Sequence, residues 1–88
     1  MESTVSTDKN VVEELTFGPN PTKDFLRIKA QKNVIRVMVY DISGNEVLRQ
    51  AGKSTEMVLN VSNLPKGIYL AQVESSAGTY QTIKVVKN

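Results

Sequence analysis

The sequence predicts an all-β protein, an immunoglobulin-like antiparallel β-sandwich of seven strands. Short segments rich in apolar and β-branched residues recur at intervals of roughly ten residues, and turn-forming residues separate them. No window shows the sustained 3.6-residue spacing of an amphipathic helix. A chain of 88 residues is long enough for one such domain and too short for two.

The seven expected strands are segments in which apolar and other residues alternate, as they do on the two faces of a sheet. They are expected over residues 11–17, 24–30, 34–41, 45–50, 56–62, 68–75 and 79–88. A turn is expected at residues 31–33 and a polar loop at residues 52–55. Tight turns are also expected at 43–45 and 64–67 and around Gly78, where Gly, Asn or Pro permits a reversal.

Each core-facing side of a strand is expected to carry the apolar members of the alternation. One such set is Leu26, Ile28 and Ala30; a second is Met57, Leu59 and Val61; a third is Tyr69, Ala71 and Val73; the last is Ile83 and Val85. The segment 34–41 is apolar on both faces, with Ile35, Val37 and Val39 on one face and Val34, Met38 and Tyr40 on the other. It is therefore expected to be a central strand.

The first ten residues are polar and rich in Ser and Thr, so residues 1–10 are predicted to be a flexible linker and residues 11–88 the folded domain. The N-terminus lacks the basic start and apolar stretch of a signal peptide. No apolar run approaches the roughly 18–20 residues that a membrane span needs. Direct membrane insertion is not expected.

Composition argues against enzymatic chemistry. The chain has no Cys and no His, and it therefore lacks thiolate metal ligands and the usual general base. Its aspartates are scattered and its five glycines occur singly, so neither a calcium loop nor a phosphate-binding loop is expected. Eleven basic and nine acidic residues give a net charge of +2 without a basic run. We expect no catalysis, no cofactor, no metal and no nucleic-acid partner.

Two lysines in the last segment, Lys84 and Lys87, are separated by an odd interval and should point to opposite faces of their strand. Lysines on an edge strand discourage pairing with other chains. The same residues could instead form a recognition element at the C-terminus. The residues themselves leave both interpretations open, and Asp41 is expected simply to bond the backbone of its turn.

Several short motifs occur in a fixed order. They are Pro-Asn-Pro-Thr at 19–22, Asp-Phe-Leu at 24–26, Val-Tyr-Asp-Ile-Ser-Gly at 39–44, Leu-Pro-Lys-Gly-Ile-Tyr at 64–69 and Ile-Lys-Val-Val-Lys-Asn at 83–88. Together they resemble the C-terminal sorting domains, type A, of cargo proteins of the type IX secretion system of Bacteroidetes. The resemblance spans residues 17–88.

That resemblance implies a seven-stranded immunoglobulin-like signal at the C-terminus of a larger exported protein. The parent would enter the periplasm by its own signal peptide, and the outer-membrane translocon would recognise the folded domain. A sortase-like cysteine peptidase would then remove the domain and could attach the cargo to a surface lipopolysaccharide. The cargo would end at the outer membrane, on the cell surface or in the medium. The present chain would be a fragment without its cargo.

The family motifs also suggest residue roles. The expected recognition residues are Gly67, Tyr69, Lys84, Val85, Val86, Lys87 and Asn88. The motif residues expected to be structural are Pro19, Asn20, Pro21, Asp41, Gly44, Leu64 and Pro65. Recognition is expected to add a strand at the edge of the terminal strand, with the lysines setting its register.

Two other functions remain open from the sequence. One is an adhesion or carbohydrate-binding module of a surface protein, which would need an exposed aromatic or acidic cluster. The other is a structural spacer, which would tolerate loss of its last five residues. The sequence also leaves open dimerisation through edge strands.

Overall fold

A computed structural model describes residues 15–88 and contains five antiparallel strands. They are β1 (Leu15–Gly18), β2 (Phe25–Asp41), β3 (Glu46–Asn60), β4 (Gly67–Ser75) and β5 (Tyr80–Lys87). The predicted all-β class is confirmed, whereas the predicted number of seven strands is wrong. The expected linker at 1–10 and the start of the first strand, 11–14, lie outside the described residues.

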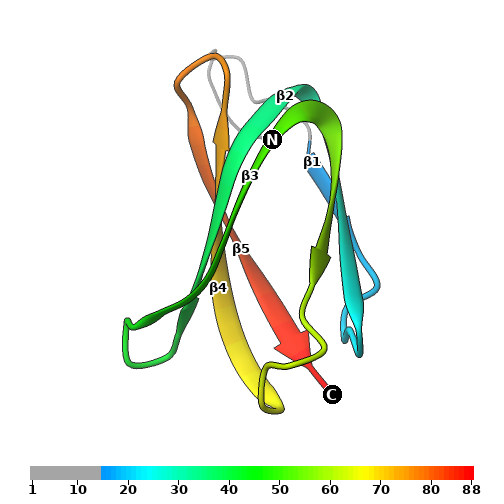
Figure 1. Cartoon of the computed structure of the whole chain (residues 1–88), viewed down its shortest axis with the longest axis vertical. Helices are drawn as coiled ribbons and strands as arrows, with labels where there is room; N and C mark the ends of the chain where they lie inside the picture. The colour runs from blue at the N-terminus through cyan, green and yellow to red at the C-terminus, as the bar shows by residue number, and fades with distance from the viewer. Residues whose placement is uncertain (1–14) are drawn as a thin grey trace, which may run out of the picture.

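Two pairs of predicted strands are continuous. Residues 31–33, expected as a turn, lie within β2, and residues 52–55, expected as a loop, lie within β3. The ladder between β2 and β3 shifts register between Lys29 and Val34 and again before Arg36. Such bulges bend and twist a strand without ending it. Figure 1 shows β2 and β3 arching together over the top of the molecule.

The bend divides one hydrogen-bonded sheet into two layers. The first half of β2 pairs with β1 on one side and with the second half of β3 on the other. The second half of β2 lies between the first half of β3 and β4, and β4 pairs with β5. The molecule is therefore a sandwich of a three-stranded and a four-stranded layer, to which β2 and β3 both contribute (Figure 1).

The core lies between the layers and confirms most of the predicted alternation. Leu26, Ile28, Met57, Leu59, Val61, Tyr69, Ala71, Val73, Ile83 and Val85 are buried. Val34 was expected on the face opposite Val37, but both are fully buried. The bulge between Val34 and Arg36 explains this difference, because an extra residue in the strand reverses the faces of the residues before it.

Gly52 allows β3 to pass closely over the core at the arch. A Cβ atom at this position would clash with the terminal methyl of Met57 and lie 3.2 Å from the carbonyl oxygen of Val34. The glycine that suggested a loop is therefore one at which the backbone approaches the other strand closely.

A buried tyrosine fastens the connection between β3 and β4. Tyr69 is 6% exposed, and its hydroxyl donates a hydrogen bond of 2.5 Å to the carbonyl oxygen of Pro65. A tyrosine near the start of a strand that bonds backbone a few residues upstream is the tyrosine corner of immunoglobulin-like sandwiches. The predicted core position of this ring is confirmed.

We expect Tyr69→Phe to lower the free energy of unfolding by about 1 kcal/mol, because it removes one hydrogen bond and little apolar contact. Tyr40→Phe is the matched control, because Tyr40 is half-buried and its hydroxyl donates to the sulfur of Met38 at 3.6 Å, which is a weak acceptor. Urea unfolding of both variants measures the difference. Equal losses would contradict a special role for the bond to Pro65.

Candidate functional site

The outer edge of β5 is covered by the segment between β1 and β2. The Asn20 amide donates from Nδ2 to the carbonyl oxygen of Lys84 at 3.2 Å and accepts at Oδ1 from the Val86 amide at 2.9 Å. One side chain thus satisfies a donor and an acceptor that a neighbouring strand would otherwise bind.

Thr22 continues this edge with its backbone. Its amide donates to the Val86 carbonyl at 2.8 Å, and its carbonyl accepts from the Asn88 amide at 2.8 Å. The fully buried Thr22 hydroxyl donates to the carbonyl oxygen of Phe25 at 2.6 Å. We call residues 19–22 the edge clasp, since they cover the outward backbone groups of β5 from the carbonyl of Lys84 to the amide of Asn88.

The two prolines flank the asparagine of the edge clasp. Pro19 and Pro21 are exposed, and the peptide bonds before them are cis. Proline has no amide hydrogen, so neither residue leaves an unpaired donor beside the edge it covers. The hydrogen bonds of Asn20 complete the edge of β5, and Pro19 and Pro21 flank this residue.

The expected recognition residues divide by burial. Val85 is 2% exposed, and Lys87, although charged, is 9% exposed with its ammonium donating to the Asn88 carbonyl oxygen at 3.1 Å. Lys84 and Asn88 are exposed and Val86 is half-buried. The prediction that Lys84 and Lys87 point to opposite faces is confirmed. In the folded domain, a partner can reach the side chains of Lys84, Val86 and Asn88.

Gly67 and Tyr69 act at the beginning of β4. Gly67 has a φ of +155°, a conformation that favours glycine, and a Cβ there would meet no atom within 4 Å. Its constraint is therefore the backbone conformation and not lack of space. Leu64 packs against the core from the same connection, and the Pro65 carbonyl accepts the Tyr69 bond.

Asp41 organises the turn between β2 and β3, as expected. Its Oδ1 atom accepts from the amides of Ser43 and Asn45, each at 2.9 Å, and the Gly44 amide donates to its backbone carbonyl at 3.0 Å. The bonds to the carboxylate, led by that from the Asn45 backbone amide, lower the pKa of Asp41. The charged carboxylate therefore stabilises the hairpin.

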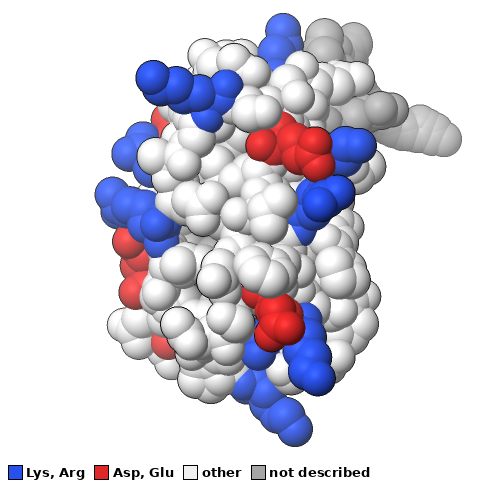
Figure 2. Space-filling view, turned by 45° about the vertical axis from the view of Figure 1, so that its right-hand side comes forward, with Lys and Arg blue, Asp and Glu red and all other residues white. Residues whose placement is uncertain are grey.

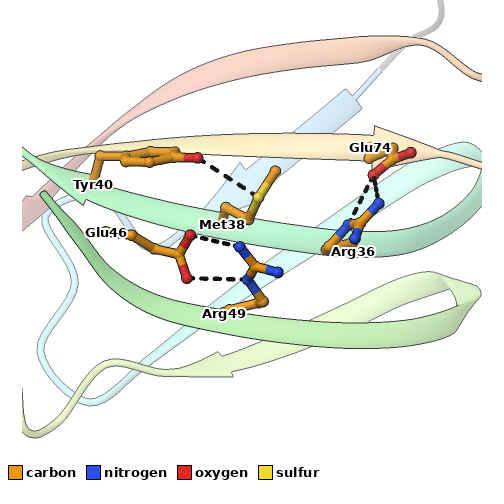
Figure 3. Close-up of polar contacts among 6 residues, drawn as sticks. All are labelled: Arg36, Met38, Tyr40, Glu46, Arg49 and Glu74. Atoms are coloured by element: carbon orange, nitrogen blue, oxygen red, sulfur yellow. Dashed lines mark hydrogen bonds and ion pairs between the residues drawn. The ribbon is translucent and has the colours of Figure 1, made fainter. Parts of the chain in front are cut away.

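Paired charges lie on the outer face of the four-stranded layer (Figure 3). Arg36 donates from Nε and Nη2 to Oε1 of Glu74, at 2.9 and 2.6 Å, and Arg49 donates to both carboxylate oxygens of Glu46. The Arg36 bond, with a smaller contribution from a hydrogen bond of Tyr80, lowers the pKa of Glu74. These groups form ion pairs across and along the strands.

The described residues contain no group of three or more acidic, His or Cys side chains that could hold a metal. Within residues 15–88 there is also no helix of the length and apolarity required to span a bilayer. Charges of both signs are spread over the face in view in Figure 2 and are not gathered into one patch.

Some residues of the candidate site were not predicted. Thr22 was named only as part of the Pro-Asn-Pro-Thr motif. Its place opposite the terminal strand arises from tertiary structure that local propensity does not encode. Ile68 and Leu70 alternate with the predicted core-facing residues Tyr69 and Ala71, and they are 47% and 45% exposed. The sequence has apolar residues on both faces of this strand, and this pattern was the signal for an exposed apolar face.

These features define a class of protein: a small immunoglobulin-like sandwich in which the edge clasp covers the last strand. The model of the family described as secretion system C-terminal sorting domain matches residues 17–88. The chain belongs to this family, which serves the type IX secretion system. Its members are targeting modules and not enzymes; they interact with the secretion machinery, and the proteins that carry them are exported to the cell surface or secreted.

Solved structures agree on the fold. A DUF3244 family protein from Bacteroides vulgatus, with an immunoglobulin-like β-sandwich fold, has a TM-score of 0.65 at 16% identity, covering 86% of this chain and 96% of its own. CopC from Methylosinus trichosporium OB3b has a TM-score of 0.50 at 20% identity, covering 89% of this chain and 90% of its own. No curated protein matches the chain.

We expect Asn20→Ala to accelerate hydrogen exchange of the Val86 amide, because that amide loses its acceptor, and to lower the free energy of unfolding by about 1 kcal/mol. The Asn88 amide, bonded to the backbone of Thr22, should keep most of its protection. Asn63→Ala is the control, since this exposed side chain forms no hydrogen bond within residues 15–88. Unchanged exchange at Val86 would contradict the edge clasp.

The lowered pKa of Glu74 predicts a pH dependence of stability. A carboxyl group with a lowered pKa contributes stability above its unfolded pKa, and this contribution is lost as the pH falls through the folded value. The unfolding free energy of the wild type should exceed that of Glu74→Gln near neutral pH. The gap should narrow as the pH falls below the ordinary value of 4.5. A pH-independent gap in urea titrations would contradict the ion pair as its cause.

Proposed function

We propose that this domain directs a larger cargo protein through the type IX outer-membrane translocon, and that the machinery recognises the folded domain at its terminal strand. The observation that carries this proposal is the family match over residues 17–88, which includes the whole of β5. Exposed Lys84 and half-buried Val86 are available on that strand. The edge clasp binds the outward backbone groups of that strand.

The route and fate of the cargo form the second part of the proposal. The parent crosses the periplasm before reaching the translocon, and a sortase-like cysteine peptidase then removes the domain and attaches the cargo to the surface. We place the cleaved bond in the linker, residues 1–10, because peptidases need exposed extended backbone and this polar segment is suited to it. Gly67 and Tyr69 contribute by fixing the conformation of the connection between β3 and β4.

A carbohydrate-binding function receives less support. Sugar-binding sandwiches generally use neighbouring exposed rings as a platform. Phe25 and Tyr80 are 55% and 54% exposed, but Phe25 lies on β2 in the three-stranded layer and Tyr80 on β5 in the four-stranded layer. The two rings therefore do not form one platform.

Export of a reporter tests the proposal. A periplasmic reporter fused to residues 1–88 should reach the surface or medium of a host with the type IX machinery and stay in the periplasm of a host lacking the translocon. Truncation after Thr82 should also leave it in the periplasm. Export that is independent of the translocon would contradict a sorting function.

The truncation needs a folding control, because it removes Ile83 and Val85 from the core. Met57→Ala is a suitable one, since it weakens the core by about 2–5 kcal/mol while leaving the terminal strand intact. We expect Met57→Ala to retain export wherever circular dichroism shows a folded domain. A spacer would predict equal export of the truncated and full-length fusions.

A further inference from the structure

Four residues form a contiguous block on the outer face of β4 and β5. Ile68 pairs with Val86 and Leu70 pairs with Lys84 in the antiparallel register. Ile68 and Leu70 are 47% and 45% exposed, Lys84 is exposed and Val86 is half-buried. We call this block the terminal patch. It combines three aliphatic side chains with one ammonium group.

The charge of the terminal patch is available to a partner. Other cations on this outer face are neutralised, since Arg36 lies 2.6 Å from Glu74 and Arg49 lies 2.8 Å from Glu46. Lys84 forms no ion pair with any residue between 15 and 88. An ammonium among exposed aliphatic groups is complementary to an apolar surface that carries a carboxylate.

The surface beside the terminal patch is hollowed. A depression of about 360 Å³ is lined by Tyr40, Ile42, Leu70 and Thr82, among others. Leu70 belongs both to this depression and to the terminal patch, so the two are continuous. A protruding apolar side chain of a partner could enter the depression while a carboxylate meets Lys84.

The edge clasp makes strand addition unfavourable where the terminal motif lies. The backbone groups that a new strand would bind at Lys84, Val86 and Asn88 already bond to Asn20 and Thr22. Adding a strand there would first require breaking these bonds. The exposed side chains of the terminal patch need no such change.

We propose that the type IX machinery binds this domain through the terminal patch, face-on, with an apolar surface that presents a carboxylate to Lys84. The inference rests on the proposed sorting function and replaces strand addition as its mode of recognition. A second copy of this chain is a poorer occupant in a two-fold contact of this patch, because the patch contains an ammonium group and no carboxylate to meet it.

Export of the same reporter fusion in the host with the machinery tests the surface. We expect Leu70→Thr and Lys84→Gln each to lower export roughly tenfold, the effect of losing a central contact. Lys84→Glu should lower it further and Lys84→Arg should retain most of it. The matched controls on the other layer, Val58→Thr and Lys29→Gln, should export normally. Thermal unfolding establishes that each variant is folded.

The outcomes separate the two proposals. If the wild-type fusion is not exported, the sorting function fails. If it is exported and folded Leu70 and Lys84 variants are exported equally well, or the control variants lose as much, the terminal patch is wrong. Increased export of Asn20→Ala, which opens the edge, would favour strand addition and overturn face-on binding. A solution dimer abolished by Leu70→Thr would assign the patch to self-association and overturn it also.

Discussion

The fold depends on β2 remaining hydrogen-bonded while it turns from one layer into the other. Three of the four strand pairings in the described chain involve β2. Its bulges near Val34 bend the strand, and Gly52 lets β3 follow it over the core. A small domain buries only a limited fraction of its surface. Because β2 and β3 each run through both layers, the chain needs no separate turn residues where they cross between the layers.

The family motifs serve two different needs of this arrangement. Asn20 and Thr22 close a sheet edge, Tyr69 and Gly67 shape a connection, and Asp41 holds a hairpin, so these residues contribute mainly to structure. Lys84 and its aliphatic neighbours contribute little to the core and remain at the surface. The motifs of this chain therefore include both residues with exposed side chains and residues whose bonds hold the edge and the turns in place.

The local sequence pattern predicted which faces of the strands are buried, but it did not predict strand continuity or the edge clasp. Period-two alternation predicts the buried faces at Leu26 and Ile28 and at Tyr69 and Ala71, because burial acts directly on that alternation. Strand continuity was missed because Gly52 and its polar neighbours resemble a loop, although here they form an arch. The contact of Asn20 with Val86 joins residues 66 apart, and no local preference encodes such a pairing.

This separation in the sequence determines when the edge clasp can form during synthesis of the chain. Asn20 and Thr22 are synthesised before the groups that they bind, which belong to residues 84–88. Long-range contacts of this kind form only after the intervening chain has been made and folded. A chain that ended before residue 84 would lack the groups that the edge clasp binds, and it would also lack Lys84 and Val86 of the terminal patch. The terminal patch can therefore lie on a strand whose edge is covered only after the chain has been synthesised through Asn88.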